Sequence, residues 1–329
     1  MTRIAMFSLG GTIAMTQQSG SGGVQPALSA SDLLAAVPGL AELGVTIDIH
    51  DFRRIPGASL TYADLLELAS SIAKQFAGGV DGIVVTQGTD TIEETAYILD
   101  LVHEGDAPVV VTGAMRSASA AGADGPANIL AALRTAASAT ARGLGVLVAF
   151  ADELHAARYV RKTHSTSITA FTSPRGPIGH VVENEVRIPL RPVRRPAIAG
   201  ADPSRRVRTS VVAATVDNDG ELLRAAGELS DGLVVAAFGA GHVPAGWVSV
   251  LENISARKPV VLASRTGSGS VLSSTYGFSG SESDLLGRGL ISAGHLDPYK
   301  ARTLLHVLML AGADRVAIDP AMRLVGDRA

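Results

Sequence analysis

The 329-residue sequence has no cysteine, which excludes disulfide bonds, thiolate metal sites and a cysteine nucleophile. Any covalent chemistry must therefore use oxygen or nitrogen. An excess of charge is also missing, because 28 basic residues stand against 31 acidic ones and the net charge is −3. So small a charge provides no field that would gather nucleic acid or an anionic membrane. The expected partner is a small neutral or zwitterionic molecule.

Long hydrophobic runs are absent as well. No apolar stretch approaches the roughly 20 residues that span a bilayer, and the runs "VVVTGA" and "LVVAAFGAG" are short and end in glycine, as buried strands do. The first three residues lead directly into the apolar run 4–9, which leaves no room for a signal-peptide core. We therefore expect a cytoplasmic protein with no membrane partner.

Several known catalytic signatures are missing too. The sequence contains neither a GxxxxGK[ST] phosphate loop nor a GxSxG nucleophile elbow. "GAGHVP" at 239–244 begins like a dinucleotide fingerprint, but Pro244 replaces the third glycine. The eight histidines are scattered without the spacing of metal ligands. We expect no catalytic metal and no cofactor.

What the sequence does contain is typical of an α/β protein. Hydrophobic residues make up 47% and charged residues 18%, as in a compact globular chain. Short Val/Ile-rich runs at 4–9, 82–86, 108–113 and 145–150 alternate with longer helical patterns, which predicts βαβ units and a largely parallel sheet. One helix is well marked, because Thr61 and Asp64 form a capping pair before an apolar stripe that ends at Gly78.

The length exceeds the usual size of one hydrophobic core, so two domains are expected. Residues 189–208 are rich in proline and arginine and lack periodicity, which is typical of an exposed linker. A nucleic-acid interpretation of these arginines is disfavoured because no aromatic residues are interleaved with them. The predicted domains are a larger, mostly parallel N-terminal one at 1–188 and a smaller α/β one at 209–329.

Two similar segments follow predicted strands, where ligands bind in open α/β sheets. The first holds Gly10, Gly11 and Thr12, and the second holds Gly88, Thr89 and Asp90. Glycines let backbone N–H groups approach a ligand, and a following helix N-terminus favours negative charge, which together could form an oxyanion hole. Each segment by itself is better explained as a tight turn followed by a helix cap.

Together, two threonines facing one pocket could supply a nucleophile and a polarising group for acyl transfer, provided that another group helps to deprotonate a hydroxyl. Lys162 is the candidate, because a desolvated lysine beside a carboxylate can accept or relay a proton. The alternative is an ordinary surface lysine among Arg158, Arg161 and His164.

Several motifs, taken in order, resemble the bacterial L-asparaginase/glutaminase family. They are "GGTIA" (10–14), "VVTQGTDTIEETAYIL" (84–99), "VTGAMR" (111–116), "DGPANI" (124–129), "RYVRKTHSTSITAFTS" (158–173) and "GAGHVP". The resemblance covers nearly the whole chain. It implies a larger N-terminal α/β domain, a smaller C-terminal one, and a homotetramer built from intimate dimers whose sites lie between subunits.

The resemblance also implies roles for individual residues. Thr12 matches the nucleophile that forms an acyl-enzyme, and Thr89 matches a second threonine grouped with Lys162 and Asp90, which also holds the substrate α-amino group. Other matched positions are expected to bind substrate. They are Gly11, Gly88, Ala58, Ser59, the carbonyl of Ala114, and Glu282 reaching in from a neighbouring subunit, with Asp284 as its competitor.

Three departures from the family pattern affect the expected substrate. No tyrosine lies between Met15 and Asp32, where relatives often carry one beside the nucleophile, and the first tyrosine is Tyr62. The segment that matches the carboxylate-binding one, often Ser-Gln or Ser-Ser in relatives, is "PGASL" here, and His242 stands where relatives often have asparagine. Each change could alter the preference between asparagine and glutamine or weaken affinity.

The expected activity is hydrolysis of L-asparagine to L-aspartate and ammonia through an acyl-threonine. Glutaminase-asparaginase activity is an alternative. Another is the amidotransferase subunit for tRNA-dependent glutamine synthesis, although that relative usually has an additional N-terminal domain and the first motif here begins near residue 8. A non-catalytic amino-acid binding protein is a third possibility, but binding alone needs neither a nucleophilic hydroxyl nor a relay lysine.

Overall fold

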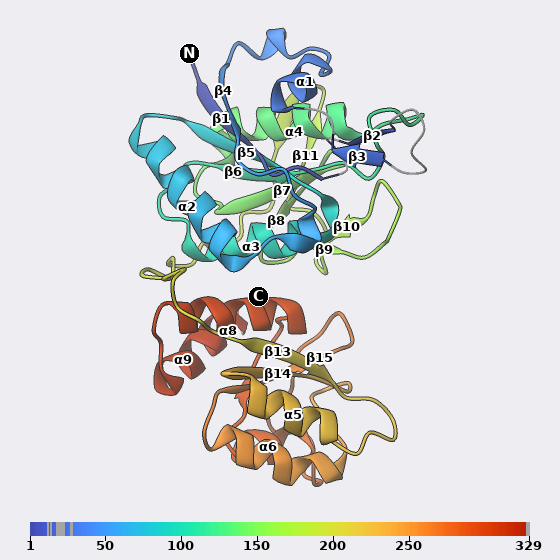
Figure 1. Cartoon of the computed structure of the whole chain (residues 1–329), viewed down its shortest axis with the longest axis vertical. Helices are drawn as coiled ribbons and strands as arrows, with labels where there is room; N and C mark the ends of the chain where they lie inside the picture. Colours follow the sequence, from blue (N-terminus) through green and yellow to red (C-terminus); the bar gives the residue numbers. More distant parts are fainter. Residues whose placement is uncertain (12, 14, 18–23, 27–28, 327–329) are drawn as a thin grey trace. The chain divides into compact units, whose positions relative to one another are not determined.

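The chain divides into two compact units, Met1–Ala197 and Ile198–Ala329, and the division falls inside the predicted linker. The structure is a computed structural model and describes residues 1–11, 13, 15–17, 24–26 and 29–326. Both units are α/β, with a largely parallel sheet in the first and a smaller parallel sheet in the second (Figure 1). The predicted fold class is confirmed.

The first unit is built on an eight-stranded sheet. In sheet order its strands are β12 (Glu185–Arg187), β11 (Gly179–Val182), β8 (Glu153–Ala156), β7 (Val146–Phe150), β6 (Val109–Thr112), β5 (Gly82–Thr86), β1 (Arg3–Ser8) and β4 (Thr46–Asp51). The strands from β7 to β4 are parallel, and the remaining three are antiparallel. β5, β6 and β7 are buried throughout, as strands covered on both faces must be.

Helices cover both faces of this sheet. α1 (Ala30–Ala35) and α4 (Gly125–Ala137) pack on one face, and α2 (Tyr62–Ala77) and α3 (Ile92–Val102) pack on the other (Figure 1). Consecutive residues of β1 serve both cores, because Ile4 and Met6 face the first pair while Ala5 and Phe7 face the second. The predicted capping pair is present, since the Thr61 hydroxyl accepts from the Asp64 N–H and the Asp64 carboxylate accepts from the Thr61 N–H.

Small elements complete the first unit. Two short hairpins pair β2 (Met15–Gln17) with β3 (Val24–Pro26) and β9 (Arg161–Lys162) with β10 (Phe171–Thr172). Four 3₁₀ turns are η2 (Ala41–Leu43), η3 (Gly57–Ser59), η4 (Thr89–Thr91) and η5 (Ala139–Ala141) among the described residues. η3 precedes α2 and η4 runs into α3, so each turn is positioned by the helix that follows it.

The arginine-rich segment is held against the first unit along its first half. Arg191 donates to the carbonyls of Thr140 and Arg142, at 2.7 and 2.8 Å, and Arg194 donates to the carbonyl of His103 at 2.7 Å. In addition, Arg158 donates to the carbonyl of Val193 at 2.6 Å. Arg191 binds carbonyls in η5 and at its C-cap, and Arg194 binds the carbonyl directly after α3, where unpaired helix-end acceptors favour a cation. The arginines therefore fasten the chain to two helix ends.

The second unit has a four-stranded parallel sheet, β13 (Thr209–Ala213), β14 (Gly232–Ala237), β15 (Val260–Ser264) and β16 (Ile291–Ser292). α5 (Glu221–Leu229) and α6 (Val248–Ser255), which follows the turn η6 (Ala245–Trp247), cover one face, while α8 (Pro298–Leu310) covers the other. α7 (Glu282–Gly287) lies against α6, and α9 (Arg315–Gly326) packs on α8 and β16. No helix among the described residues is long and apolar enough to span a membrane.

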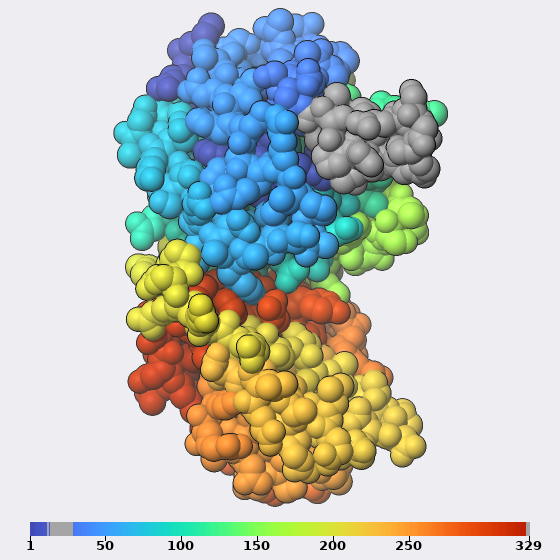
Figure 2. All heavy atoms as spheres, viewed as in Figure 1, coloured from blue at the N-terminus to red at the C-terminus, as the bar shows by residue number. Residues whose placement is uncertain are grey.

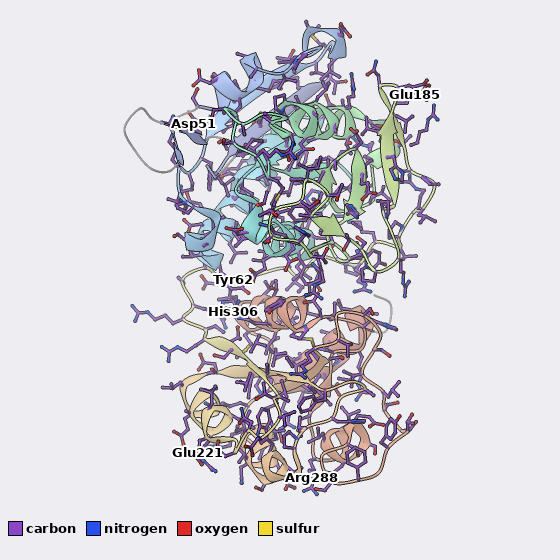
Figure 3. The ribbon with its side chains drawn as sticks, turned by 90° about the vertical axis from the view of Figure 1, so that its right-hand side faces the viewer. Asp51, Tyr62, Glu185, Glu221, Arg288 and His306 are labelled. Carbon is purple, nitrogen blue, oxygen red and sulfur yellow. The ribbon has the colours of Figure 1, made fainter. Side chains whose placement is uncertain are left out.

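His306 makes the second unit sensitive to acid. The side chain lies on α8 (Figure 3), where its Nδ1 is 3.0 Å from the Thr209 hydroxyl of β13. Burial, and secondly the nearby Arg302, lower the pKa of this imidazole to about 4. Since an unfolded histidine titrates near 6.5, the unfolded state binds more protons below that pH. The contribution of neutral His306 to stability is therefore complete above pH 6.5 and is lost as the pH falls towards 4.

We expect His306→Gln to flatten this dependence, because glutamine keeps hydrogen-bonding capacity but carries no titrating group. The measurement is the unfolding midpoint between pH 7.5 and 4.5, and the wild type should lose more than the variant over this range. The exposed His295 in the same unit provides the control, and His295→Gln should follow the wild type. Equal acid slopes in His306→Gln and wild type would contradict the assignment.

Candidate active site

The first two predicted segments meet because their strands are neighbours in the sheet. β1 pairs with β5 in parallel with Ser8 opposite Thr86, so the residues after each strand end arrive side by side. Gly11 has φ +92°, and a Cβ on it would lie 2.1 Å from the Gly88 nitrogen. No side chain fits there, so the two loops can touch backbone to backbone only with glycine at 11. Thr12 itself lies outside the described residues.

Thr89, Asp90 and Lys162 form a hydrogen-bonded cluster. The Lys162 ammonium donates to the Thr89 hydroxyl at 2.9 Å and to the Asp90 carboxylate at 2.7 Å. Thr89 is 5% exposed and the Lys162 side chain 14%, whereas the Asp90 side chain is 72% exposed. An ion pair with so exposed a partner adds little stability. Its effect is to orient the ammonium on a buried hydroxyl and leave one carboxylate edge open to a ligand.

Glu93 positions Lys162 in this cluster, which the sequence did not indicate. Its carboxylate, in the first turn of α3, accepts the backbone N–H of Lys162 at 2.5 Å. The hairpin strand β9 is thereby tied to the same helix that begins just after Thr89 and Asp90. The only signal in the sequence was the acidic pair Glu93-Glu94 at a helix start, where acids are common for electrostatic reasons.

A buried glutamine joins the Thr89 segment to the segment of Ala58 and Ser59. The Gln87 amide donates to the Gly88 carbonyl and the Thr91 hydroxyl, both at 3.2 Å, and Thr91 donates to the Gly57 carbonyl at 3.1 Å. Gln87 is fully buried, while Ala58 and Ser59 in η3 are exposed. η3 therefore lies beside η4 with two exposed residues available to a ligand.

The turn that holds Ala114 is fixed by the "DGPANI" motif. Asp124 accepts the N–H groups of Met115 at 3.0 Å and Arg116 at 2.9 Å. Asn128 donates to the Gly113 carbonyl at 3.0 Å and accepts the N–H of Ala151 at the same distance, which bridges the ends of β6 and β7. Ala114 is buried and directly follows Gly113, which packs closely on the Gln87 carbonyl.

The predicted acidic residue Glu282 is fully buried in the second unit. One carboxylate oxygen accepts the N–H groups of Thr275 and Tyr276, both at 2.9 Å, and the other lies 3.2 Å from His242 Nε2. Burial alone would raise the pKa of this carboxyl, but the hydrogen bonds from its own loop and from His242 outweigh burial and lower it. His242 also stacks edge-on with the rings of Tyr276 and Phe278. A role of Glu282 at a neighbouring subunit's site stays a prediction.

Asp284, the competing candidate, forms hydrogen bonds within its own segment. Its carboxylate accepts the N–H of Gly280 at 2.9 Å and the Arg288 guanidinium at 2.8 Å. The hydrogen bond from Gly280, followed by that from Arg288, lowers the pKa of this carboxyl. Asp284 therefore connects the start and end of α7.

Within the described part of the chain, no group of three or more histidine, aspartate or glutamate side chains could hold a metal ion.

A hydroxyl, a lysine and a carboxylate at the strand ends of a doubly covered parallel sheet define an α/β protein with a candidate acyl-transfer site. Family models assign it more closely. The model "Asparaginase, N-terminal" matches residues 3–194, and "Glutaminase/Asparaginase C-terminal domain" matches residues 208–322. The chain belongs to the asparaginase family.

Individual relatives are similar over nearly the full length. A probable L-asparaginase of Deinococcus radiodurans is 38% identical over 96% of this chain and 95% of its own length. An L-asparaginase of Bacillus licheniformis is 34% identical over 93% of this chain and 95% of its own. The crystal structure of a probable cytoplasmic L-asparaginase from Campylobacter jejuni superposes with a TM-score of 0.87 at 33% identity, covering 98% and 99% of the two chains.

Proposed function

We propose that this protein is an amidohydrolase that converts L-asparagine to L-aspartate and ammonia in two acyl-transfer steps. Family membership and the full-length similarity to L-asparaginases support the reaction. The observation that carries the proposal is the Lys162–Thr89–Asp90 cluster at the end of β5, beside the loop that follows β1. If these segments were only tight turns and helix caps, a lysine hydrogen-bonded to a buried threonine would have no role in them.

In the first step, the Thr12 oxygen attacks the side-chain amide carbon, its hydroxyl proton is passed to the amide nitrogen, and the carbonyl oxygen takes the electron pair of the broken π bond. N–H groups beside the glycines of both strand-end loops would hold this oxyanion. Collapse re-forms the carbonyl and expels the amide nitrogen, which leaves as ammonia with that proton. Water then attacks the acyl-threonine, one of its protons passes to the Thr12 oxygen, and Thr12 leaves as its hydroxyl to release aspartate.

The proposal assigns the proton transfers of these steps to Thr89 and Lys162. The Thr89 hydroxyl accepts from the Lys162 ammonium at 2.9 Å, so its own hydrogen can point towards a ligand or a water. The accessible edge of Asp90 would hold the substrate α-ammonium group by charge. Ala58 and Ser59 in η3 are candidates for the α-carboxylate, and the Ala114 carbonyl is the candidate acceptor for the side-chain amide N–H.

The wider assembly and location belong to the same proposal. A dimer of dimers would place Glu282 of one copy near the site of another, and a cytoplasmic location agrees with the description of the Campylobacter jejuni protein. Sedimentation of the purified protein tests the assembly. A monomer with full activity would overturn the part assigned to Glu282.

The direct test is ammonia release by the purified protein from L-asparagine and, separately, from L-glutamine. We expect saturable turnover of asparagine with the larger kcat/KM, because the amide must reach Thr12 while the α-ammonium group stays on Asp90. A larger kcat/KM for glutamine would move the protein to the glutaminase-asparaginases. A folded protein that binds asparagine without turnover would support the binding-protein alternative.

A further inference from the structure

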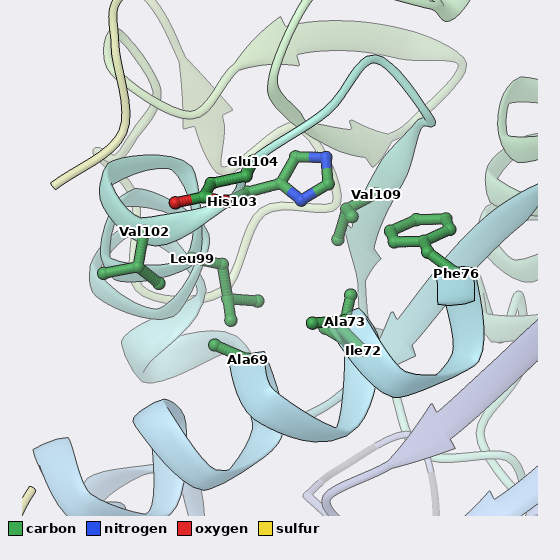
Figure 4. A pocket seen from close by; sticks show the side chains of 9 residues that line it. All are labelled: Ala69, Ile72, Ala73, Phe76, Leu99, Val102, His103, Glu104 and Val109. Atoms are coloured by element: carbon green, nitrogen blue, oxygen red, sulfur yellow. The ribbon is translucent and has the colours of Figure 1, made fainter. Parts of the chain in front are cut away.

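A pocket of about 190 Å³ lies between α2 and α3, outside the candidate active site (Figure 4). The helices supply Ala69 and Phe76 on one side and Leu99 on the other, and Val109 of β6 forms the floor. α2 lies at the surface of the first unit, within the light-blue area of Figure 2. The exposed residues Ala73 and Glu104 mark the mouth of the pocket. Apolar cavities of this size can hold a single aromatic ring, whereas a peptide helix would not fit.

One polar group faces this otherwise apolar space, namely the His103 imidazole opposite Phe76 (Figure 4). Its Nε2 lies 3.0 Å from the Ala107 carbonyl and must be the protonated nitrogen, because a carbonyl only accepts. Burial lowers the pKa of His103 despite that hydrogen bond, so the ring is neutral near pH 7. Nδ1 is then an acceptor, and no donor among the described residues is bonded to it.

The acceptor and the charge at the mouth select the ligand. A molecule that fills the pocket can satisfy Nδ1 only by offering an N–H or O–H donor, and a buried acceptor without a partner is unfavourable. The Glu104 carboxylate at the rim disfavours anionic ligands, and the Arg194 guanidinium, which donates to the His103 carbonyl, disfavours cationic ones. The fitting chemistry is one small aromatic ring system with a single N–H donor and no negative charge.

α3 connects this pocket to the candidate catalytic cluster. Its C-terminal end supplies Leu99 and leads to His103, while its N-terminal end continues from Thr89 and Asp90. Glu93 in its first turn holds Lys162. An 11-residue helix is about 16 Å long, so one continuous element joins the pocket to the cluster.

We infer that the α2–α3 pocket is an effector site that binds a small, uncharged aromatic N–H donor and alters turnover through α3. The effect on turnover rests on the proposed function, whereas binding does not. Indole is the probe, because it combines a ring system of suitable size with one N–H. Benzothiophene is the matched control, because it has nearly the same shape and no donor.

The experiment measures ligand binding calorimetrically to the full chain and to two variants of α2. Ala69→Leu fills the pocket, and Ser70→Leu adds the same side chain at the adjacent exposed position. We expect saturable binding of indole to the wild type, at least about fivefold tighter than benzothiophene for the loss of one hydrogen bond. Binding should fall more than about tenfold in Ala69→Leu, since the ligand and the added side chain compete for one space, and stay within about twofold in Ser70→Leu.

The second readout is kcat/KM for asparagine at saturating indole. We expect a change of at least about twofold in the wild type and in Ser70→Leu, and none in Ala69→Leu.

If indole does not bind to the folded wild type, or binds equally well to Ala69→Leu, the proposed binding site is wrong. Binding that appears only on dilution overturns it too, because a second copy then covers the pocket. Binding without a change in rate overturns the effector role. If the chain turns over no asparagine, the proposed function and the effector role both fail, while calorimetry still supports or overturns the binding site.

Discussion

Thr12→Ala is expected to abolish asparagine hydrolysis while leaving the fold intact. The proposed reaction forms a bond between the threonine oxygen and the substrate carbon, and alanine has no atom that can take its place. Loss of a covalent nucleophile lowers kcat by about 10⁴-fold or more, because what remains is binding and oxyanion stabilisation. The measurement is ammonia release at saturating asparagine, with the unfolding midpoint recorded in parallel.

Thr12→Ser is the matched control for this prediction. Serine keeps the hydroxyl and removes only a methyl group. The kcat of Thr12→Ser should therefore lie within a few orders of magnitude of the wild-type value and clearly above that of Thr12→Ala. The acyl-enzyme provides a second readout, because a threonine ester should accumulate on a rapid quench if its hydrolysis is slow. Turnover by Thr12→Ala at a near-normal rate would exclude Thr12 as the nucleophile.

Lys162→Met is expected to lower kcat by about 10²- to 10⁴-fold, the range of a lost general acid or base. Methionine has nearly the same length but cannot donate to the Thr89 hydroxyl, 2.9 Å from the ammonium. Thr89→Val removes the other end of that hydrogen bond and should cost a similar factor. Because the two groups act as one relay, the double variant should be little worse than either single one.

Lys74→Met is the control, because Lys74 is an exposed lysine in the last turn of α2 and is not part of the cluster. It should retain the kinetics of the wild type. Fully multiplicative losses in the double variant would show that Lys162 and Thr89 act independently, which contradicts a shared relay. A defect confined to KM would instead assign Lys162 to substrate binding.

Much of the fold could be read from local pattern. Four strands of the first sheet, β1, β5, β6 and β7, were predicted within one or two residues, because β5, β6 and β7 are short apolar runs that must be buried on both faces. The start of α2 was equally clear, since the capping pair of Thr61 and Asp64 is a contact between residues three apart. The helix α9 was not predicted, and Pro320 within it is a residue that normally argues against a helix.

Pattern was less informative where distant segments meet. The arginines of the proline-rich segment suggested a solvated linker, yet Arg191 and Arg194 donate to carbonyls about 50 and 90 positions away along the chain. Nothing in their spacing indicates such acceptors, because helix-end carbonyls become available only once α3 and η5 have formed and packed. The same holds for Glu93, whose partner is the backbone of Lys162.

The sequence by itself determined which groups are available for chemistry and where each stands along the chain. The lack of cysteine limited the nucleophile to oxygen or nitrogen, and the glycines at 10, 11 and 88 marked where backbone must approach backbone. Only the tertiary structure decided that Lys162 donates to Thr89 and Asp90 and that Glu282 is buried under its own loop. The physical reason is range: caps and strand patterns depend on neighbours within a few residues, whereas these contacts exist only after the sheet has aligned its strand ends.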